Sequence, residues 1–200
     1  MKLILVRHGQ TDSNLSLRFQ GQTDGLLNKT GDMQVEYLGK WLYSHNHSVD
    51  AIFSSPLARC RQTISPYTWL CKYVGDIVTV NDLQELHYGE WEGKTWNDIP
   101  TDIWHSWESD PLSVHISGGE RMMDFARRNQ AAFQGIIREY EDTDKTVLVS
   151  THGGNIRSFI RDLLGVPWTN YWSISILNAS VTEVVIKRDS ISKVVFVGNA

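Results

Sequence analysis

The chain begins with a short apolar run, Leu3 to Val6, which stops at Arg7, His8 and Gly9. Consecutive apolar residues over this length are typical of a strand that is buried on both faces of a parallel sheet. In open α/β sheets, ligands bind beyond the carboxyl ends of the strands. The Arg-His pair is therefore expected in an anion pocket, with the histidine as a nucleophile or a proton carrier. For this stretch alone, a solvated arginine beside a hydrogen-bonded histidine is an equal alternative.

Further apolar runs alternate with helical patterns along the chain. Strands are predicted at 49–53, 76–80 and 145–150, helices lie between them, and a hairpin at 181–186 and 193–197 is expected to pair with the sheet edge. This alternation predicts an α/β fold, a three-layer sandwich with a mostly parallel central sheet flanked by helices. With 200 residues, 41% of them hydrophobic, the chain can bury one sizeable core, so residues 1–200 are expected to form a single domain.

Local signals predict where two of the helices begin. Thr30 is expected to cap a helix that ends near residues 44–47, and Ser55 is expected to cap another helix, with Pro56 in its first turn. The polar segment 12–27 has no sustained period and is predicted to be a functional loop. The aromatic-rich segment 96–111 is predicted to form short helices beside the sheet, with its tryptophans packed in the core.

Composition excludes several classes of partner. The formal net charge is −4 and is spread along the chain, so a nucleic-acid partner is not expected. No apolar run approaches the roughly 18 residues that span a membrane, and the first run is too short for a secretion signal, which favours the cytoplasm. If Cys60 and Cys71 share one helix, they lie about 16 Å apart and act as small apolar residues. A homodimer is left open.

Four predicted strands are each followed by polar groups that suit phosphoryl transfer. Arg7 and His8 follow the first strand, Arg59 the second, Glu85 the third and His152 the fourth. Parallel strands bring these groups to one edge of the sheet. Arginine binds phosphate oxygens through a fixed fork of donors, and a histidine nitrogen can carry the phosphoryl group covalently. Glu85 is expected to protonate the leaving oxygen and then to deprotonate the attacking water.

A metal centre built from His8, Glu85 and His152 is the competing chemical interpretation. Neighbouring arginines repel a divalent cation, and close ligand spacings such as HExxH are missing from the sequence. We therefore expect no metal and no cofactor. His87 is close enough to Glu85 in sequence to be expected in the same cleft.

Six motifs occur in an order that identifies a family resemblance. They are LVRHGQTDSN, RFQGQTDGLLNKTG, SSPLARCRQT, LQELHYGEWEG, SGGE and STHGGNIR. Together they resemble the histidine phosphatase superfamily, in its phosphoglycerate mutase-like branch, over most of the chain.

The resemblance implies a role for each matched residue. His8 corresponds to the phosphorylated nucleophile and Glu85 to the proton donor, while Arg7, Arg59 and His152 hold the phosphoryl group. Other matches correspond to the substrate pocket, namely Asn14, Gln20, Gly21 and Gly153. Arg121 departs from the family pattern, either as an additional anion contact or, as we favour, as a solvated helix residue.

The short chain and its GEWEG segment favour a phosphatase over a mutase, since the mutases of this family usually carry longer insertions around the cleft. We expect a cofactor-independent phosphomonoesterase acting on a small phosphorylated metabolite, similar to the α-ribazole phosphatase and broad-specificity phosphatase members. Phosphoglycerate mutase is the alternative. A non-catalytic module that binds a phosphorylated ligand is a third hypothesis, although both histidines and the acid are retained.

Overall fold

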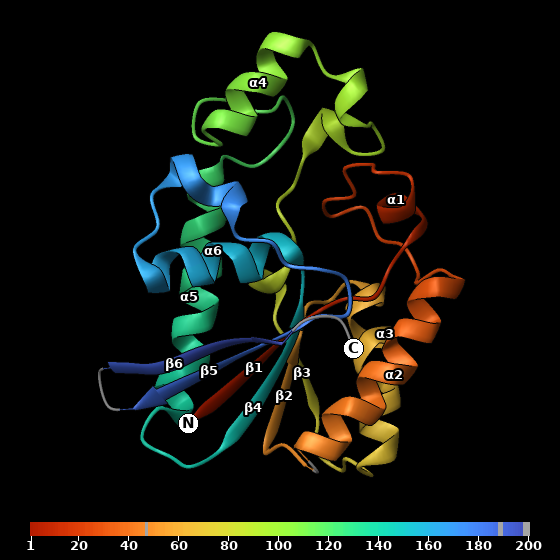
Figure 1. Cartoon of the computed structure of the whole chain (residues 1–200), viewed down its shortest axis with the longest axis vertical. Helices are drawn as coiled ribbons and strands as arrows, with labels where there is room; N and C mark the ends of the chain where they lie inside the picture. Colours follow the sequence, from red (N-terminus) through yellow and green to blue (C-terminus); the bar gives the residue numbers. More distant parts are fainter. Residues whose placement is uncertain (47, 188–189, 198–200) are drawn as a thin grey trace.

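A computed structural model describes residues 1–46, 48–187 and 190–197, the last range by its backbone (Figure 1). Its sheet has six strands in the order β3-β2-β4-β1-β5-β6. The strands are β1 (Lys2–Arg7), β2 (Ala51–Ser54), β3 (Ile77–Thr79), β4 (Thr146–Thr151), β5 (Val181–Lys187) and β6 (Ser190–Val197). Strands β1 to β4 run parallel, whereas β5 pairs antiparallel with β1 and β6 antiparallel with β5. The predicted mostly parallel sheet with a terminal hairpin is confirmed.

Helices cover both faces of the sheet, as the three-layer prediction requires. They are α1 (Asp12–Leu15), α2 (Lys29–His45), α3 (Ala58–Leu70), α4 (Thr101–Ser109), α5 (Met122–Tyr140) and α6 (Gly153–Leu164). Successive residues of β1 face opposite sides, since Leu3 and Leu5 pack with α5 and α6 while Ile4 and Val6 pack with α2 and α3. The apolar run therefore serves two cores at once.

A third hydrophobic cluster lies beyond the carboxyl edge of the sheet, around α4 (Figure 1). We call it the cap core, and its buried members are Leu86, Trp91, Ile99, Trp107, Ile116, Met122, Phe125 and Tyr171. The short turns η2 (Gly89–Trp91), η3 (Trp96–Asp98) and η4 (Trp168–Ser173) surround it, while η1 (Asn81–Leu83) lies nearer the sheet and packs on α5. Residues 96–111 form short helices as predicted, but these lie beyond the carboxyl edge of the sheet instead of beside it, because Ile99 and Trp107 pack in the cap core. Trp107 is buried in this core, whereas Trp96 is 48% exposed.

Three local predictions are corrected by the capping contacts. Asn28, rather than Thr30, caps α2, since its side-chain oxygen accepts a hydrogen bond from the Gly31 nitrogen at 2.9 Å. Helix α3 begins at Ala58 after Leu57, so Ser55 is not its cap and Pro56 precedes it. The segment 12–27 is not wholly a loop, because α1 forms one turn behind the Thr11 cap. Helix α2 ends at His45, and residue 47 lies outside the described residues.

Helices α2 and α3 approach closely at Gly39, and this contact helps to orient the helix that carries Arg59. A methyl group on Gly39 would lie 2.9 Å from the Pro66 Cβ atom and 2.9 Å from the Tyr67 nitrogen. We expect Gly39→Ala to lower the free energy of unfolding by about 1–3 kcal/mol, because the added carbon overpacks the helix contact. Urea unfolding measures the change.

Gly135 on α5 provides the matched control, since a methyl group there meets no atom of the described structure within 4 Å. Gly135→Ala is expected to raise the free energy of unfolding by up to about 1 kcal/mol through helix propensity alone. Stabilisation by both substitutions would contradict the close packing of α2 on α3.

Candidate active site

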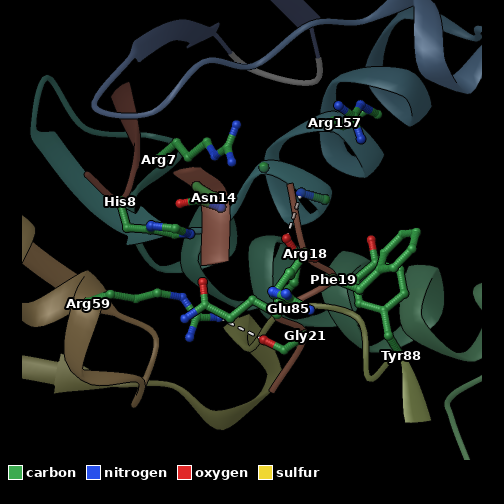
Figure 2. A pocket seen from close by; sticks show the side chains of 13 residues that line it. Arg7, His8, Asn14, Arg18, Phe19, Gly21, Arg59, Glu85, Tyr88 and Arg157 are labelled. Carbon is green, nitrogen blue, oxygen red and sulfur yellow. Dashed lines mark hydrogen bonds between the residues drawn. The ribbon is translucent and has the colours of Figure 1, made fainter. Parts of the chain in front are cut away.

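The carboxyl ends of the four parallel strands meet at a cavity of about 160 Å³ (Figure 2). All but one of the site residues predicted from the sequence line this cavity. They are Arg7, His8, Asn14, Gln20, Gly21, Arg59, Glu85 and Gly153. The exception is His152, which lies behind His8, with the two ring centres 5.2 Å apart and the rings nearly edge to face. The strand ends therefore bring the predicted groups together.

The His8 ring is fixed so that one nitrogen is left for chemistry. Its Nδ1 atom lies 2.7 Å from the Gly9 carbonyl oxygen, an acceptor, so Nδ1 carries the proton and Nε2 holds the free electron pair. Burial lowers the pKa of His8 well below the usual histidine value, and the positive charges of Arg59 and Arg7 lower it further. The ring is therefore neutral at physiological pH, which is the form required of a nucleophile.

His152 caps the amino end of α6 and is completely buried. Its Nε2 atom lies 2.9 Å from the Ser55 hydroxyl oxygen and 3.5 Å from the Cys60 sulfur. Burial lowers the pKa of His152 well below its usual value, with further lowering by Arg59 and by His8. The hydroxyl of Ser55 thus orients a catalytic-site ring instead of capping a helix.

Backbone carbonyl groups hold two arginines, Arg59, which is buried, and Arg7, which is half-buried. Arg59 donates to the Gly21 oxygen at 2.7 Å (Figure 2) and to the Thr23 oxygen at 2.9 Å. Arg7 donates to the Ile176 oxygen at 2.5 Å. Burial lowers the pKa of Arg7 to about 10 and also lowers the pKa of Arg59, so both side chains stay charged at neutral pH. Within the described chain, the Nε atoms of both arginines are buried without a hydrogen-bond partner. Unpaired donors of this kind can form hydrogen bonds to an anionic ligand.

The Glu85 carboxylate faces the cavity with both oxygens hydrogen-bonded to backbone nitrogens. Oε1 accepts from Leu86 at 2.9 Å and Oε2 accepts from Gly154 at 3.0 Å. A methyl group on Gly154 would lie 2.1 Å from Oε1, so a side chain at this position would displace the carboxylate. The main-chain oxygen of Glu85 accepts from Arg128, which is paired with Glu120 at 2.7 Å. Glu85 is thus fixed from both its side chain and its backbone.

A hydrogen-bond network positions Asn14 at the cavity wall. The Asn14 side-chain oxygen accepts from the Thr11 backbone nitrogen at 3.1 Å and from the Asn178 amide at 3.0 Å. The same Asn178 amide donates to the His8 carbonyl oxygen at 3.1 Å. Gln20 joins the network by accepting from the Thr11 hydroxyl at 2.9 Å. With its oxygen occupied, the amide nitrogen of Asn14 is the group that can donate to a ligand.

Two residues considered from the sequence lie elsewhere. The expectation that His87 lines the cleft is wrong, because its ring turns toward Glu92, with 3.7 Å between Nε2 and a carboxylate oxygen. Arg121 is exposed at the start of α5 and lines a different hollow with Leu112 and His115. It does not reach the cavity that contains His8.

Sequence reasoning missed four side chains that line the cavity, Arg18, Phe19, Tyr88 and Arg157. Arg18 and Phe19 belong to the RFQGQTDG motif. Tyr88 belongs to ELHYGE, where the neighbouring His87 was predicted to line the cleft. Arg157 ends the STHGGNIR motif on α6. Arg157 could have been predicted as a cavity residue, because it is a basic residue in the first turns of the helix that begins directly after His152.

No group of three His, Cys, Asp or Glu side chains within the described ranges is arranged to hold a metal ion. A separate search of the described helices finds none that is both long and apolar enough to cross a bilayer. Cys60 and Cys71 are both free thiols.

The fold is an α/β sandwich with a strongly basic cavity at the carboxyl ends of its parallel strands, and comparison with known proteins identifies the family. The model of the histidine phosphatase superfamily (branch 1) matches residues 3–198. The chain therefore belongs to this superfamily, as its motifs predicted.

Several named relatives are phosphatases. The chain is 29% identical to a putative phosphoserine phosphatase 2 of Hydrogenobacter thermophilus, over 92% of this chain and 88% of the relative. It is 31% identical to a glucosyl-3-phosphoglycerate phosphatase of Mycobacterium tuberculosis, over 91% and 84%. A solved structure of Bacillus stearothermophilus YhfR superposes with a TM-score of 0.87 at 28% identity, covering 100% of this chain and 97% of the other. These relatives confirm the predicted phosphatase over the mutase.

The environment of the two histidines predicts how they titrate. We expect both rings to stay neutral as the pH falls through about 6.5, where unperturbed histidine gains its proton. Burial and the neighbouring arginines disfavour the charged forms of His8 and His152. Nitrogen-15 NMR of the imidazole groups measures the protonation of each ring and should show a protonated Nδ1 on His8.

The same histidines in the urea-unfolded protein provide the reference, where protonation near 6.5 is expected. Since the unfolded rings then bind more protons than the folded ones, this contribution to stability is complete above that pH and is lost as the pH falls. Titration of either folded ring near 6.5 would contradict the electrostatic description of the site.

Proposed function

We propose that the protein hydrolyses phosphomonoesters of small metabolites in two steps, with His8 as the covalent carrier. In the first step the Nε2 atom of His8 forms a bond to phosphorus while the bond between phosphorus and the ester oxygen breaks. Glu85, in its protonated form, gives its proton to the departing oxygen, so that an alcohol leaves instead of an alkoxide. Arg7 and Arg59 stabilise the negative charge on the transferring oxygens.

The second step releases the phosphate. A water molecule attacks the phosphohistidine and transfers its proton to the Glu85 carboxylate as the phosphorus–nitrogen bond breaks. The electron pair returns to Nε2, and inorganic phosphate leaves with the acid and the nucleophile restored. His152, edge to face with His8, is proposed to hold the phosphoryl group together with the two arginines, while Asn14, Gln20, Gly21 and Gly153 form the substrate pocket.

One observation carries this proposal: Nδ1 of His8 is held by a carbonyl oxygen, which leaves the unprotonated Nε2 beside two cationic side chains. A binding module needs positive charge but has no use for a neutral imidazole fixed in one tautomer. The cavity volume of about 160 Å³ supports a small substrate. The names of the two relatives, which refer to phosphoserine and glucosyl-3-phosphoglycerate, support a phosphorylated metabolite.

The proposal includes independence of any metal or cofactor and action in the cytoplasm. Arginine and histidine supply the charge that a divalent ion would otherwise provide. A relative from Arabidopsis thaliana, 30% identical over 78% of this chain, is named a metal-independent phosphoserine phosphatase. The two free thiols are consistent with a reducing compartment.

The phosphohistidine is tested with p-nitrophenyl phosphate in a rapid-quench experiment performed in EDTA. We expect an acid-labile phosphoryl adduct on His8 in the parent protein, and in His8→Ala we expect loss of the adduct and a fall in kcat of at least about 10³-fold. Mass spectrometry under basic conditions locates the adduct.

His105→Ala is the control, since His105 is exposed on α4. Unchanged turnover in His8→Ala, or an adduct on another residue, would overturn the mechanism. Activity that EDTA abolishes and a divalent ion restores would overturn its metal independence.

The acid role of Glu85 is tested by the dependence on the leaving group. Glu85→Gln is expected to slow glycerol 3-phosphate by about 10²–10⁴-fold, since its alcohol leaves poorly without a proton. The loss with p-nitrophenyl phosphate should be smaller by about tenfold or more, because nitrophenolate departs readily. Exposed Glu90→Gln is the control. Equal losses with both esters would remove Glu85 as the acid.

A further inference from the structure

The cavity contains more positive charge than a simple phosphate ester can balance. Four arginines line it, and the carboxylate in its lining is that of Glu85. A bound phosphomonoester brings about two negative charges, which match the pair Arg7 and Arg59 beside His8. Arg18 is exposed and donates to the Gly93 carbonyl oxygen at 2.5 Å, so water screens its charge. Arg157 is half-buried, and neither the phosphoryl group nor water balances its charge.

Arg157 lies away from the transferring group. Figure 2 shows it on α6, on the side of the cavity opposite Arg59, while Tyr88 forms the neighbouring wall. The acid Glu85 lies between these two sides in the same view. An ester whose phosphorus faces His8 and whose bridging oxygen faces Glu85 would extend its alcohol part toward Arg157.

The Arg157 guanidinium is fixed before any ligand binds. Its Nε atom donates to the Ile174 carbonyl oxygen at 2.8 Å. Its central carbon lies 5.2 Å from the centre of the Tyr171 ring and 4.9 Å from that of Trp172. Stacking on two aromatic rings reduces the conformational entropy that a flexible arginine would lose when it binds an anion.

Three other arginines of α5 and α6 have acidic partners, whereas Arg157 has none within the described chain. Arg161 pairs with Asp162, Arg128 with Glu120 and Arg127 with Asp124. Among the residues that the structure describes, no carboxylate lies within 4.0 Å of the Arg157 nitrogens. A half-buried, oriented guanidinium without a counter-ion in a ligand cavity is a binding site for an anion.

We propose that Arg157 binds a second anionic group on the alcohol part of the substrate. The preferred substrates are then small phosphomonoesters whose alcohol carries a carboxylate or a second phosphate. This inference rests on the proposed phosphatase function and specifies its substrate class. Arg157 selects the substrate and takes no part in the transfer of the phosphoryl group.

Two matched pairs of esters test the inference. 3-Phosphoglycerate carries a carboxylate where glycerol 3-phosphate carries a hydroxymethyl group. Fructose 1,6-bisphosphate and fructose 6-phosphate differ in a second phosphate. The parent protein is expected to prefer the anionic member of at least one pair by about 10- to 100-fold in kcat/KM, and the pair concerned tells which anion is bound.

Arg157→Met keeps an unbranched side chain against the two rings and removes the charge. It is expected to reduce the preference to about threefold or less, mainly through a higher KM, because the contact exists before and during the reaction. Arg157→Lys should restore part of the preference, since it returns a charge without the planar fork.

Arg161→Met is the matched control. Arg161 lies one turn further along α6 and stacks on Trp168 at 3.9 Å, but it does not line the cavity. Its substitution should leave the preference unchanged. Circular dichroism and the rate with p-nitrophenyl phosphate show whether each variant is folded.

Other results overturn the inference. A parent protein that forms the His8 adduct but prefers neither anionic ester has no second anion site, although the proposed phosphatase function stands. Equal losses with both members of each pair in Arg157→Met would place Arg157 on the transferred phosphoryl group. Absence of the His8 adduct in the parent protein would instead remove the proposed mechanism itself.

Discussion

Two arginines lie at the carboxyl edge of the sheet, Arg59 buried and Arg7 half-buried, and no ion pair stabilises either within the described chain. A buried charge without compensation is costly, and backbone carbonyl oxygens supply part of the compensation here. The oxygens of Gly21 and Thr23 hold Arg59, and that of Ile176 holds Arg7. The Nε atoms of both arginines stay unpaired within the described chain, and under the proposed function a bound phosphate group supplies the balancing negative charge.

Residues outside the cavity hold these carbonyl groups in place. The Glu92 carboxylate accepts hydrogen bonds from the Gln22 and Thr23 nitrogens at 3.0 Å and thereby fixes the segment that binds Arg59. Gly21 within this segment has a φ of +56°, a conformation that residues with a side chain rarely adopt. Arg128 performs a similar task at the main chain of Glu85. The chemistry therefore depends on side chains that never touch the substrate.

Sequence patterns predicted the parts of the structure that depend on long apolar runs. A long apolar run has few alternatives to a buried strand, so the prediction that Arg7, His8, Arg59 and Glu85 lie together after the strand ends was correct. Polar side chains with several available partners were not predictable: Ser55 could cap a helix or orient His152, and the fold uses the second contact. The irregular segment before η2 has no periodic pattern that distinguishes the direction of the His87 side chain from that of Tyr88. The role of Arg157 depends on aromatic residues distant in sequence, and helical periodicity alone does not reveal them.

The cap core is separate from the two hydrophobic cores on the faces of the sheet. Helix α5 contributes residues to the cap core at its amino end and to one of the sheet cores further along. Tyr88 and the rings beneath Arg157 belong to this cap, whereas His8 and His152 stand on strand ends. Under the proposed roles, the cap supplies most of the wall that meets the alcohol, and the sheet supplies the two histidines. Substitutions among the cap rings can then alter which alcohol the cavity accepts, whereas those that move Leu86 or Glu92 also disturb Glu85 or the segment that binds Arg59.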